Sequence, residues 1–271
     1  MKLMLLTGDC AFAKKAESCG VDRIFIDLEH INKADRQKGR NAYLTCNTIN
    51  DVAPMRMALT KAELLVRVNP INPLSKEEID AVCEAGADLI MLPMVFDEDD
   101  VKTFVELVGG RAKCVPMIET PQAMARIDDI LDVEGIDELY IGLNDLHIGL
   151  GLTFMFEPLS GGLLDYMATK INKKGIPFGF GGMAKIGEGM LPAECILAEH
   201  FRLGSTTVIL SRTFRNEVDA EGKPILDLPS EIDKIRKEEK RIASWDEKYI
   251  AENRKTVKNT VKNIVSVIQN G

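Results

Sequence analysis

Short, continuously apolar runs recur along the whole chain, separated by longer segments of helical character. The runs lie at 2–7, 23–29, 64–69, 89–95, 113–119, 138–144, 177–182 and 206–212. Parallel strands that are covered on both faces have continuously apolar sequences, whereas half-exposed strands alternate. The pattern therefore predicts eight parallel β-strands connected by helices.

The segments between these runs carry helix boundary signals. Ser75 with Glu78 forms a capping-box pattern, and Thr120-Pro121 supplies an N-cap followed by proline at the first helical position. A glycine typical of a helix C-terminus stands shortly before five of the runs, at Gly20, Gly86, Gly135, Gly175 and Gly204. Eight strands with repeated helix-to-strand returns predict a TIM (β/α)8 barrel over residues 1–216.

The composition changes after the last run. Residues 217–229 form a polar connector, and a charged region with an apolar stripe at helical spacing follows it at Val257, Val261, Ile264, Val265 and Ile268. We predict that 217–271 is a connector and an extended C-terminal helical segment. This segment either closes on its own barrel within one domain or packs on a neighbouring subunit of a homo-oligomer.

Composition and charge narrow the class of protein. The chain has 271 residues, of which 45% are hydrophobic and 28% charged, and its formal net charge is -8. An acidic protein is a poor partner for nucleic acid, which is bound by basic surfaces. Six cysteines without a CxxC pair indicate reduced thiols in a cytoplasmic protein. The apolar run at the N-terminus is too short for a signal peptide or a membrane span, so we expect no membrane partner.

Candidate chemistry lies at the predicted strand ends, where barrels of this kind carry their functional groups. Asp27 and His30 follow the second strand, Arg67 is on the third, Glu119 ends the fifth and Asp145 follows the sixth. Two carboxylates with water and substrate in the remaining positions are a usual way to hold Mg²⁺, and an arginine there suits an anionic substrate. The alternatives are that each acid caps the following helix and that Arg67 pairs with one of them.

The histidines and two further groups are weaker candidates. His30 is either a catalytic base or a surface residue, His147 is a candidate for substrate contact, and His200 is expected to be structural. Two further groups are candidate binding sites for an anionic group of the substrate. One is a basic loop, which is alternatively only a solvated loop, and the other is a glycine-rich strand with the residues after the eighth strand, where glycine alternatively only permits tight packing. They comprise Lys33, Arg36, Lys38 and Arg40, and Gly179 to Gly182 with Ser211-Arg212.

Five motifs at these strand ends occur in the order of a known family. They are Asp27-Leu28-Glu29-His30, Arg67-Val68-Asn69-Pro70, Met91-Leu92-Pro93-Met94-Val95, Ile118-Glu119-Thr120 and Ile141-Gly142-Leu143-Asn144-Asp145-Leu146. Together they resemble the class II pyruvate-dependent aldolase and citrate lyase β-subunit family of the phosphoenolpyruvate/pyruvate superfamily. One departure is Met117, where aldolases of the family often carry glutamine.

The resemblance implies both a cofactor and roles for the rim residues. Glu119 and Asp145 would hold Mg²⁺ or Mn²⁺, which the carboxylate and keto oxygens of a 2-oxo acid would chelate. Arg67 would stabilise the enolate, and His30 would move a proton directly or through a metal-bound water. The backbone near Asn144 would receive the substrate carboxylate. We also expect substrate contacts from two more residues, Asp27 and His147.

The function implied by the resemblance is that of a metal-dependent carbon–carbon lyase. It would cleave or form a 4-hydroxy-2-oxo acid through a pyruvate-type enolate. One alternative is an acyl-CoA lyase of the citrate lyase β-subunit type. Another is a non-catalytic barrel that binds a 2-oxo acid or a phosphorylated sugar.

Overall fold

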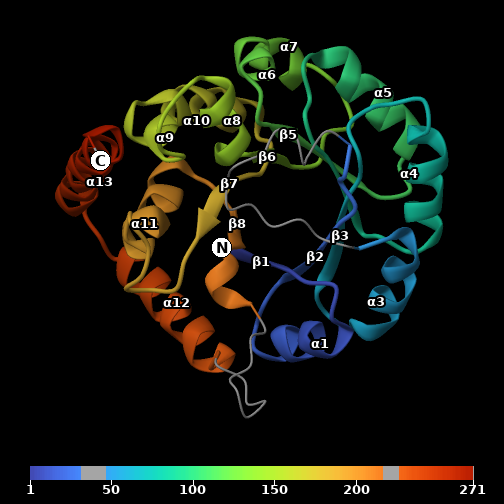
Figure 1. Cartoon of the computed structure of the whole chain (residues 1–271), viewed down its shortest axis with the longest axis horizontal. Helices are drawn as coiled ribbons and strands as arrows, with labels where there is room; N and C mark the ends of the chain where they lie inside the picture. The colour runs from blue at the N-terminus through green and yellow to red at the C-terminus, as the bar shows by residue number, and fades with distance from the viewer. Residues whose placement is uncertain (32–46, 216–225, 271) are drawn as a thin grey trace.

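Eight parallel strands form a closed barrel in sequence order, with the helices arranged around it (Figure 1). The computed structural model describes residues 1–31, 47–215 and 226–270. The predicted TIM (β/α)8 fold is confirmed. The strands are β1 Lys2–Leu6, β2 Arg23–Asp27, β3 Glu63–Arg67, β4 Leu89–Leu92, β5 Lys113–Ile118, β6 Leu139–Ile141, β7 Phe178–Met183 and β8 Thr207–Leu210.

Seven of the eight strands end one to three residues before their apolar runs, whereas β7 ends one residue later. β6 has three residues, and helix α8 (Leu143–Gly149) begins directly after Gly142. The expected strand over 138–144 is therefore wrong at its end. Asp145 lies in the first turn of a helix and does not follow directly from a strand.

The helix boundaries confirm most of the predicted signals. All five glycines named above have a positive φ, between 72° and 94°. Thr120 caps α6 (Pro121–Ala125) by accepting the Ala123 N–H at 3.0 Å. The helices of the barrel are α1 Cys10–Ser18, η1 Ile49–Asp51, α3 Val52–Ala58, α4 Ser75–Glu84, α5 Glu98–Val108, α7 Ile127–Leu131, α9 Glu157–Ser160, α10 Leu163–Lys174, α11 Ala193–Leu203 and η2 Arg212–Phe214.

The capping-box prediction for α4 is wrong. Leu74 is the N-cap residue and makes no side-chain cap bond. Ser75 Oγ accepts the Asn72 N–H at 2.9 Å, and the Glu78 carboxylate binds Asn69 at the end of β3. A contact with a residue outside the helix thus takes the place of the local pattern.

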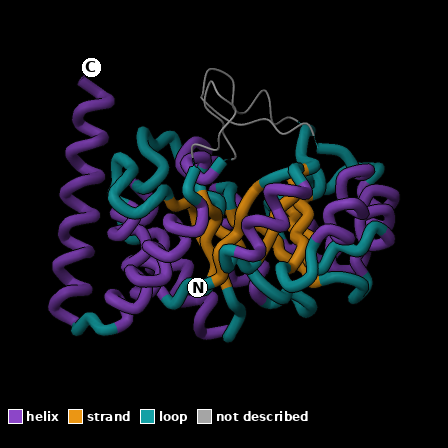
Figure 2. Tube along the Cα trace, turned by 90° about the horizontal axis from the view of Figure 1, so that it is seen from below, coloured by secondary structure: helices purple, strands orange, loops and turns teal. Residues whose placement is uncertain are grey.

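Two further helices follow the barrel, α12 (Leu228–Ala243) and α13 (Glu247–Asn270). α13 stands beside the barrel, and its C-terminal end projects past the neighbouring helices (Figure 2). Val257, Val261 and Ile264 are buried where α13 packs on α9 and α11, whereas Ile268 is 46% exposed. Contact of this helix with a neighbouring subunit stays a prediction. Within the described ranges, no helix is both long and apolar enough to cross a membrane.

The interior of the barrel has three layers. Since side chains alternate along a strand, every second residue points inward. The middle of the interior is an apolar cluster, to which β4 and β5 each contribute two successive inward positions; it consists of Met4, Phe25, Leu65, Leu89, Met91, Val115, Met117 and Tyr140. Charged residues lie above and below it at the alternate positions of the same strands, namely Arg23 and Asp27 on β2, and Glu63 and Arg67 on β3.

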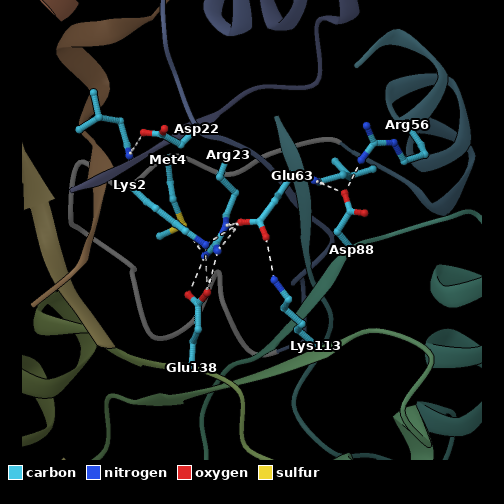
Figure 3. A network of polar contacts seen from close by, with 11 residues as sticks. Lys2, Met4, Asp22, Arg23, Arg56, Glu63, Asp88, Lys113 and Glu138 are labelled. Atoms are coloured by element: carbon cyan, nitrogen blue, oxygen red, sulfur yellow. Dashed lines mark hydrogen bonds and ion pairs between the residues drawn. The ribbon is translucent and has the colours of Figure 1, made fainter. Parts of the chain in front are cut away.

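The lower charged layer closes the N-terminal end of the barrel (Figure 3). The Arg23 guanidinium, 1% exposed, donates two hydrogen bonds to Glu138 at 2.8 and 2.9 Å and two to Glu63 at 2.7 and 3.3 Å. Lys2 and Lys113 also bind Glu63, at 3.0 and 2.9 Å. Burial raises the pKa of Glu63, but hydrogen bonds from Lys113, Arg23 and Lys2 outweigh it and lower the pKa to about 2. These carboxylates are therefore ionised and paired at neutral pH.

Candidate active site

Arg67 lies at the top of the barrel, held by acids from the neighbouring strand. Its Nε and Nη2 donate to the two oxygens of Asp27 at 2.9 and 2.8 Å, and Nη2 is 3.4 Å from Glu29. The guanidinium also lies over the Phe25 ring at 5.4 Å and near the Met117 sulfur at 3.8 Å. Burial lowers the pKa of Arg67, but Asp27 and the nearby acids raise it, so the guanidinium stays charged. A two-point ion pair fixes its plane.

Glu119 is buried next to this pair, at the end of β5. It is 3% exposed, and its Oε1 accepts the backbone N–H of Met94 at 2.8 Å. Burial is the main reason that its pKa is raised to about 8, and the charge of Asp145 adds to the effect against the opposing charge of Arg67. An acid of this kind favours a bound proton or a bound cation over the bare carboxylate.

Asp145 reaches the same place from α8. It shares with Glu119 a cavity of about 250 Å³, whose other walls include Phe96, Pro121 and Ile148. The two carboxylates therefore face one opening. Drug-sized ligands occupy cavities of roughly 300–1,000 Å³, so this one suits a smaller molecule.

The charges around this cavity favour a cation. One guanidinium, that of Arg67, interacts with three carboxylates, those of Asp27, Glu29 and Glu119, and Glu119 interacts with Asp145 in addition. Within the described part of the chain, no three His, Cys, Asp or Glu side chains come together as a metal site. Two carboxylates with the remaining positions left to water and substrate are an arrangement that suits Mg²⁺. The donor set fits such an ion.

His30 lies at the rim after β2, in residues 28–31 (the His30 loop), which Asn69 organises. Asn69 Oδ1 accepts the backbone N–H groups of His30 and Ile31 at 2.9 and 3.0 Å, while its Nδ2 donates to Glu78 at 2.8 Å. His30 Nδ1 is 3.1 Å from the Leu28 carbonyl. Because a carbonyl only accepts, Nδ1 carries the proton, and Nε2 of the neutral ring is left as the acceptor.

The remaining predicted residues have differing environments. Asp27 is the ion-pair partner of Arg67, and a contact between Asp27 and substrate stays a prediction. Asn144 is exposed on α8, whereas His147 is 5% exposed with Nδ1 3.1 Å from the Leu143 carbonyl. His200 is buried against the Phe180 ring at 3.7 Å between centroids, and burial lowers its pKa to about 3, as suits a neutral structural residue.

The two candidate anion-binding sites have different outcomes. The basic loop with Lys33, Arg36, Lys38 and Arg40 lies outside the described residues. In β7, a Cβ at Gly179 would lie 2.5 Å from the Tyr140 ring, and the Tyr140 hydroxyl donates to the Gly181 carbonyl at 2.5 Å. Glycine in this strand therefore makes room for Tyr140.

The sequence placed Asn69 at the rim, but it did not show how Asn69, Glu78 and Met94 position the site. Asn69 and Glu78 act on the His30 loop, and Met94 supplies the N–H that holds Glu119. Met94 has a φ of 52°, in the left-handed region that non-glycine residues seldom adopt. The sequence also did not predict the ion-pair network around Arg23. Its position two residues before Phe25 and four before Asp27 could have shown that its side chain points into the barrel.

Comparisons with known proteins identify the family. The family model described as HpcH/HpaI aldolase/citrate lyase matches residues 3–157. The chain belongs to this family, which confirms the resemblance drawn from the motifs.

Individual relatives are more distant. A hydroxypyruvate/pyruvate aldolase of Rhizorhabdus wittichii is 33% identical over 37% of this chain and 50% of its own length. A 2-keto-3-deoxy-L-rhamnonate aldolase of Escherichia coli is 25% identical over 51% of this chain and 58% of its own. The chain thus spans little more than half of these relatives.

A solved structure supports the fold. An HpcH/HpaI aldolase/citrate lyase family protein from Burkholderia cenocepacia superposes with a TM-score of 0.63 at 16% identity, covering 90% of this chain and 95% of the other. At this identity the likeness concerns the fold alone.

Proposed function

We propose that this protein is a divalent-metal-dependent carbon–carbon lyase that forms or cleaves a 4-hydroxy-2-oxo acid through a pyruvate-type enolate. The observation that carries the proposal is the buried Glu119 carboxylate, which shares a cavity with the half-buried Asp145 beside a fixed, charged Arg67. Membership of an aldolase/citrate lyase family and the printed activities of the two relatives point to the same chemistry.

Glu119 and Asp145 would hold Mg²⁺ or Mn²⁺. When bound, the ion supplies a Lewis acid for the keto oxygen of the substrate. The protein supplies the rest of the site. Asp27 fixes the plane of Arg67, so its guanidinium is already oriented when negative charge develops on the enolate oxygen. Such preorganisation requires no rearrangement during the reaction.

His30 is the proposed proton carrier. Its Nδ1–H is directed to the Leu28 carbonyl, so Nε2 is available to take a proton from the substrate's C4 hydroxyl group as the C3–C4 bond breaks. In the reverse direction the same nitrogen returns the proton to the aldehyde oxygen. Asn69 keeps the His30 loop in place through two backbone hydrogen bonds.

The cavity supports a small substrate over an acyl-CoA. Its volume of about 250 Å³ suits a short 2-oxo acid. Met117, at 3% exposure, provides an apolar thioether beside Arg67, so the floor of the site lacks the amide of a glutamine. The acyl-CoA lyase and the non-catalytic barrel remain the alternatives. Cytoplasmic location, homo-oligomeric assembly and the division at residue 216 also stay predictions.

Exchange of pyruvate methyl protons into deuterated water tests the proposal directly. Mg²⁺- or Mn²⁺-dependent exchange is expected, with loss of exchange in Glu119→Gln and Asp145→Asn. Glu106→Gln, which changes an exposed acid on α5, is the control. Absence of exchange with Mg²⁺, Mn²⁺ and Co²⁺ would refute the aldolase, and turnover confined to coenzyme A thioesters would favour the acyl-CoA lyase.

A further inference from the structure

Gly142 lies against the Glu119 carboxylate. A Cβ built on Gly142 would overlap Glu119 Oε2, lie 2.7 Å from Glu119 Cβ and lie 3.0 Å from Met117 Cε. Backbone conformation does not explain the glycine, because its φ of -82° and ψ of 90° are open to other residues. The reason for glycine at this position is therefore space, and the space is filled by Glu119.

The backbone locates both oxygens of this carboxylate. Oε1 accepts the Met94 N–H at 2.8 Å, and Oε2 lies over Gly142. Turning the side chain away from a new methyl group would break the bond to Met94. Moving Glu119 Cβ away would require a shift of β5, whose end is tied to Gly142 by the bond from Gly142 N–H to the Ile118 carbonyl at 3.1 Å. A Cβ at position 142 therefore displaces Glu119 from at least one of these contacts.

The same residue links the two acids. Gly142 is the N-cap of α8, which carries Asp145 in its first turn. If the strand resisted a side chain at 142, α8 would move and take Asp145 with it. Either response changes the separation of the two carboxylates.

We propose that Gly142 is a positioning residue that sets the placement of the Glu119 carboxylate relative to Asp145, and so the affinity of the pair for a divalent cation. This inference rests on the proposed function, because it concerns the same cation site. The proposed role depends on the absence of a side chain at Gly142. The backbone N–H of Gly142 is engaged separately, in the bond to β5.

The test is the Mn²⁺ affinity of the purified full chain, measured by calorimetry and by the electron paramagnetic resonance of free Mn²⁺. Gly142→Ala is expected to lower the affinity by about tenfold or more, the effect usual for groups that support metal ligands. Gly182→Ala is the matched control, since its Cβ would lie 3.7 Å from the nearest atom outside its neighbours, the Ile209 carbonyl oxygen. Its affinity should match that of the wild-type protein.

Two outcomes would overturn the inference. The first is a folded Gly142→Ala protein that binds Mn²⁺ as tightly as the wild type. If Gly142→Ala does not fold, the second is that the double variant Gly142→Ala/Glu119→Gly does not fold either. Adding Glu119→Gly removes the atoms of Glu119 that a Cβ at 142 would meet, and folding should then recover; without recovery, Gly142 serves something other than Glu119. A wild-type protein that binds no Mn²⁺ would instead refute the proposed function.

Discussion

The metal affinity of this protein should depend steeply on pH, because the cation and a proton compete for Glu119. Burial and the charge of Asp145 raise the pKa of Glu119 to about 8, so the carboxyl group is mostly protonated at neutral pH. A raised acid pKa means that lowering the pH adds the proton and removes the ligand. Metal binding must release that proton.

The size of the effect follows from this value. With a pKa near 8, roughly 1% of Glu119 is ionised at pH 6, about a tenth at pH 7 and half at pH 8. The apparent affinity for Mg²⁺ should therefore rise about fiftyfold between pH 6 and pH 8, and only about twofold more above it.

Calorimetric titration with Mg²⁺ from pH 6 to pH 9 measures this dependence. Repeating it in two buffers of different ionisation enthalpy counts the protons, and we expect about one released per ion near pH 6. Glu119→Gln should abolish binding and proton release together. An affinity that stays flat from pH 6 to pH 8, without proton release, would show that Glu119 is ionised in the free protein or is not a ligand.

Three further predictions concern residues that position the site or close the barrel. Arg23→Met should lower the free energy of unfolding in urea by about 3–5 kcal/mol, because it leaves the buried Glu138 without its main partner. A loss below about 1 kcal/mol would contradict that account. Asn69→Ala should reduce the rate of pyruvate proton exchange through disorder of the His30 loop and leave Mn²⁺ affinity unchanged; loss of Mn²⁺ affinity in this variant would tie Asn69 to the metal. Met94→Val should be less stable than Met94→Gly by about 1–2 kcal/mol in thermal unfolding, since a β-branched side chain is strained at a φ of 52°. Equal stability of the two would mean that the left-handed conformation is not retained.

The fold could be predicted from the sequence because apolar runs alternate regularly with helical segments along the chain. The eight apolar runs come from strands covered on both faces, and the five glycines come from the C-terminal ends of helices. Both signals lie within a few residues of local sequence. The ends of the runs were less readable. After Ile141 the apolar residues continue at Leu143 and Leu146, and a short apolar run does not distinguish a strand from the start of a buried helix. This is why Asp145 was expected next to a strand and lies on α8 instead.

The candidate site was readable where its residues stand at strand ends, as Arg67 and Glu119 do. Residues whose role depends on a partner elsewhere in the chain could not be predicted. Glu78 was assigned to a helix cap because the capping pattern is local, whereas its actual partner Asn69 lies outside the helix, nine positions earlier in the chain. Met94 carries its role in its backbone N–H, which the side chain does not reveal.

The location of Asp145 on α8 has a consequence for how the protein moves. Glu119 extends from a strand inside a closed barrel, but Asp145 rides on a seven-residue helix, an element short enough to open independently of the sheet. An ion shared by both acids would tie that helix to the strand. The amide hydrogens of residues 143–149 should then exchange with solvent quickly in the metal-free protein and slowly in the loaded one. Hydrogen exchange at α8 would thus report metal occupancy without any substrate.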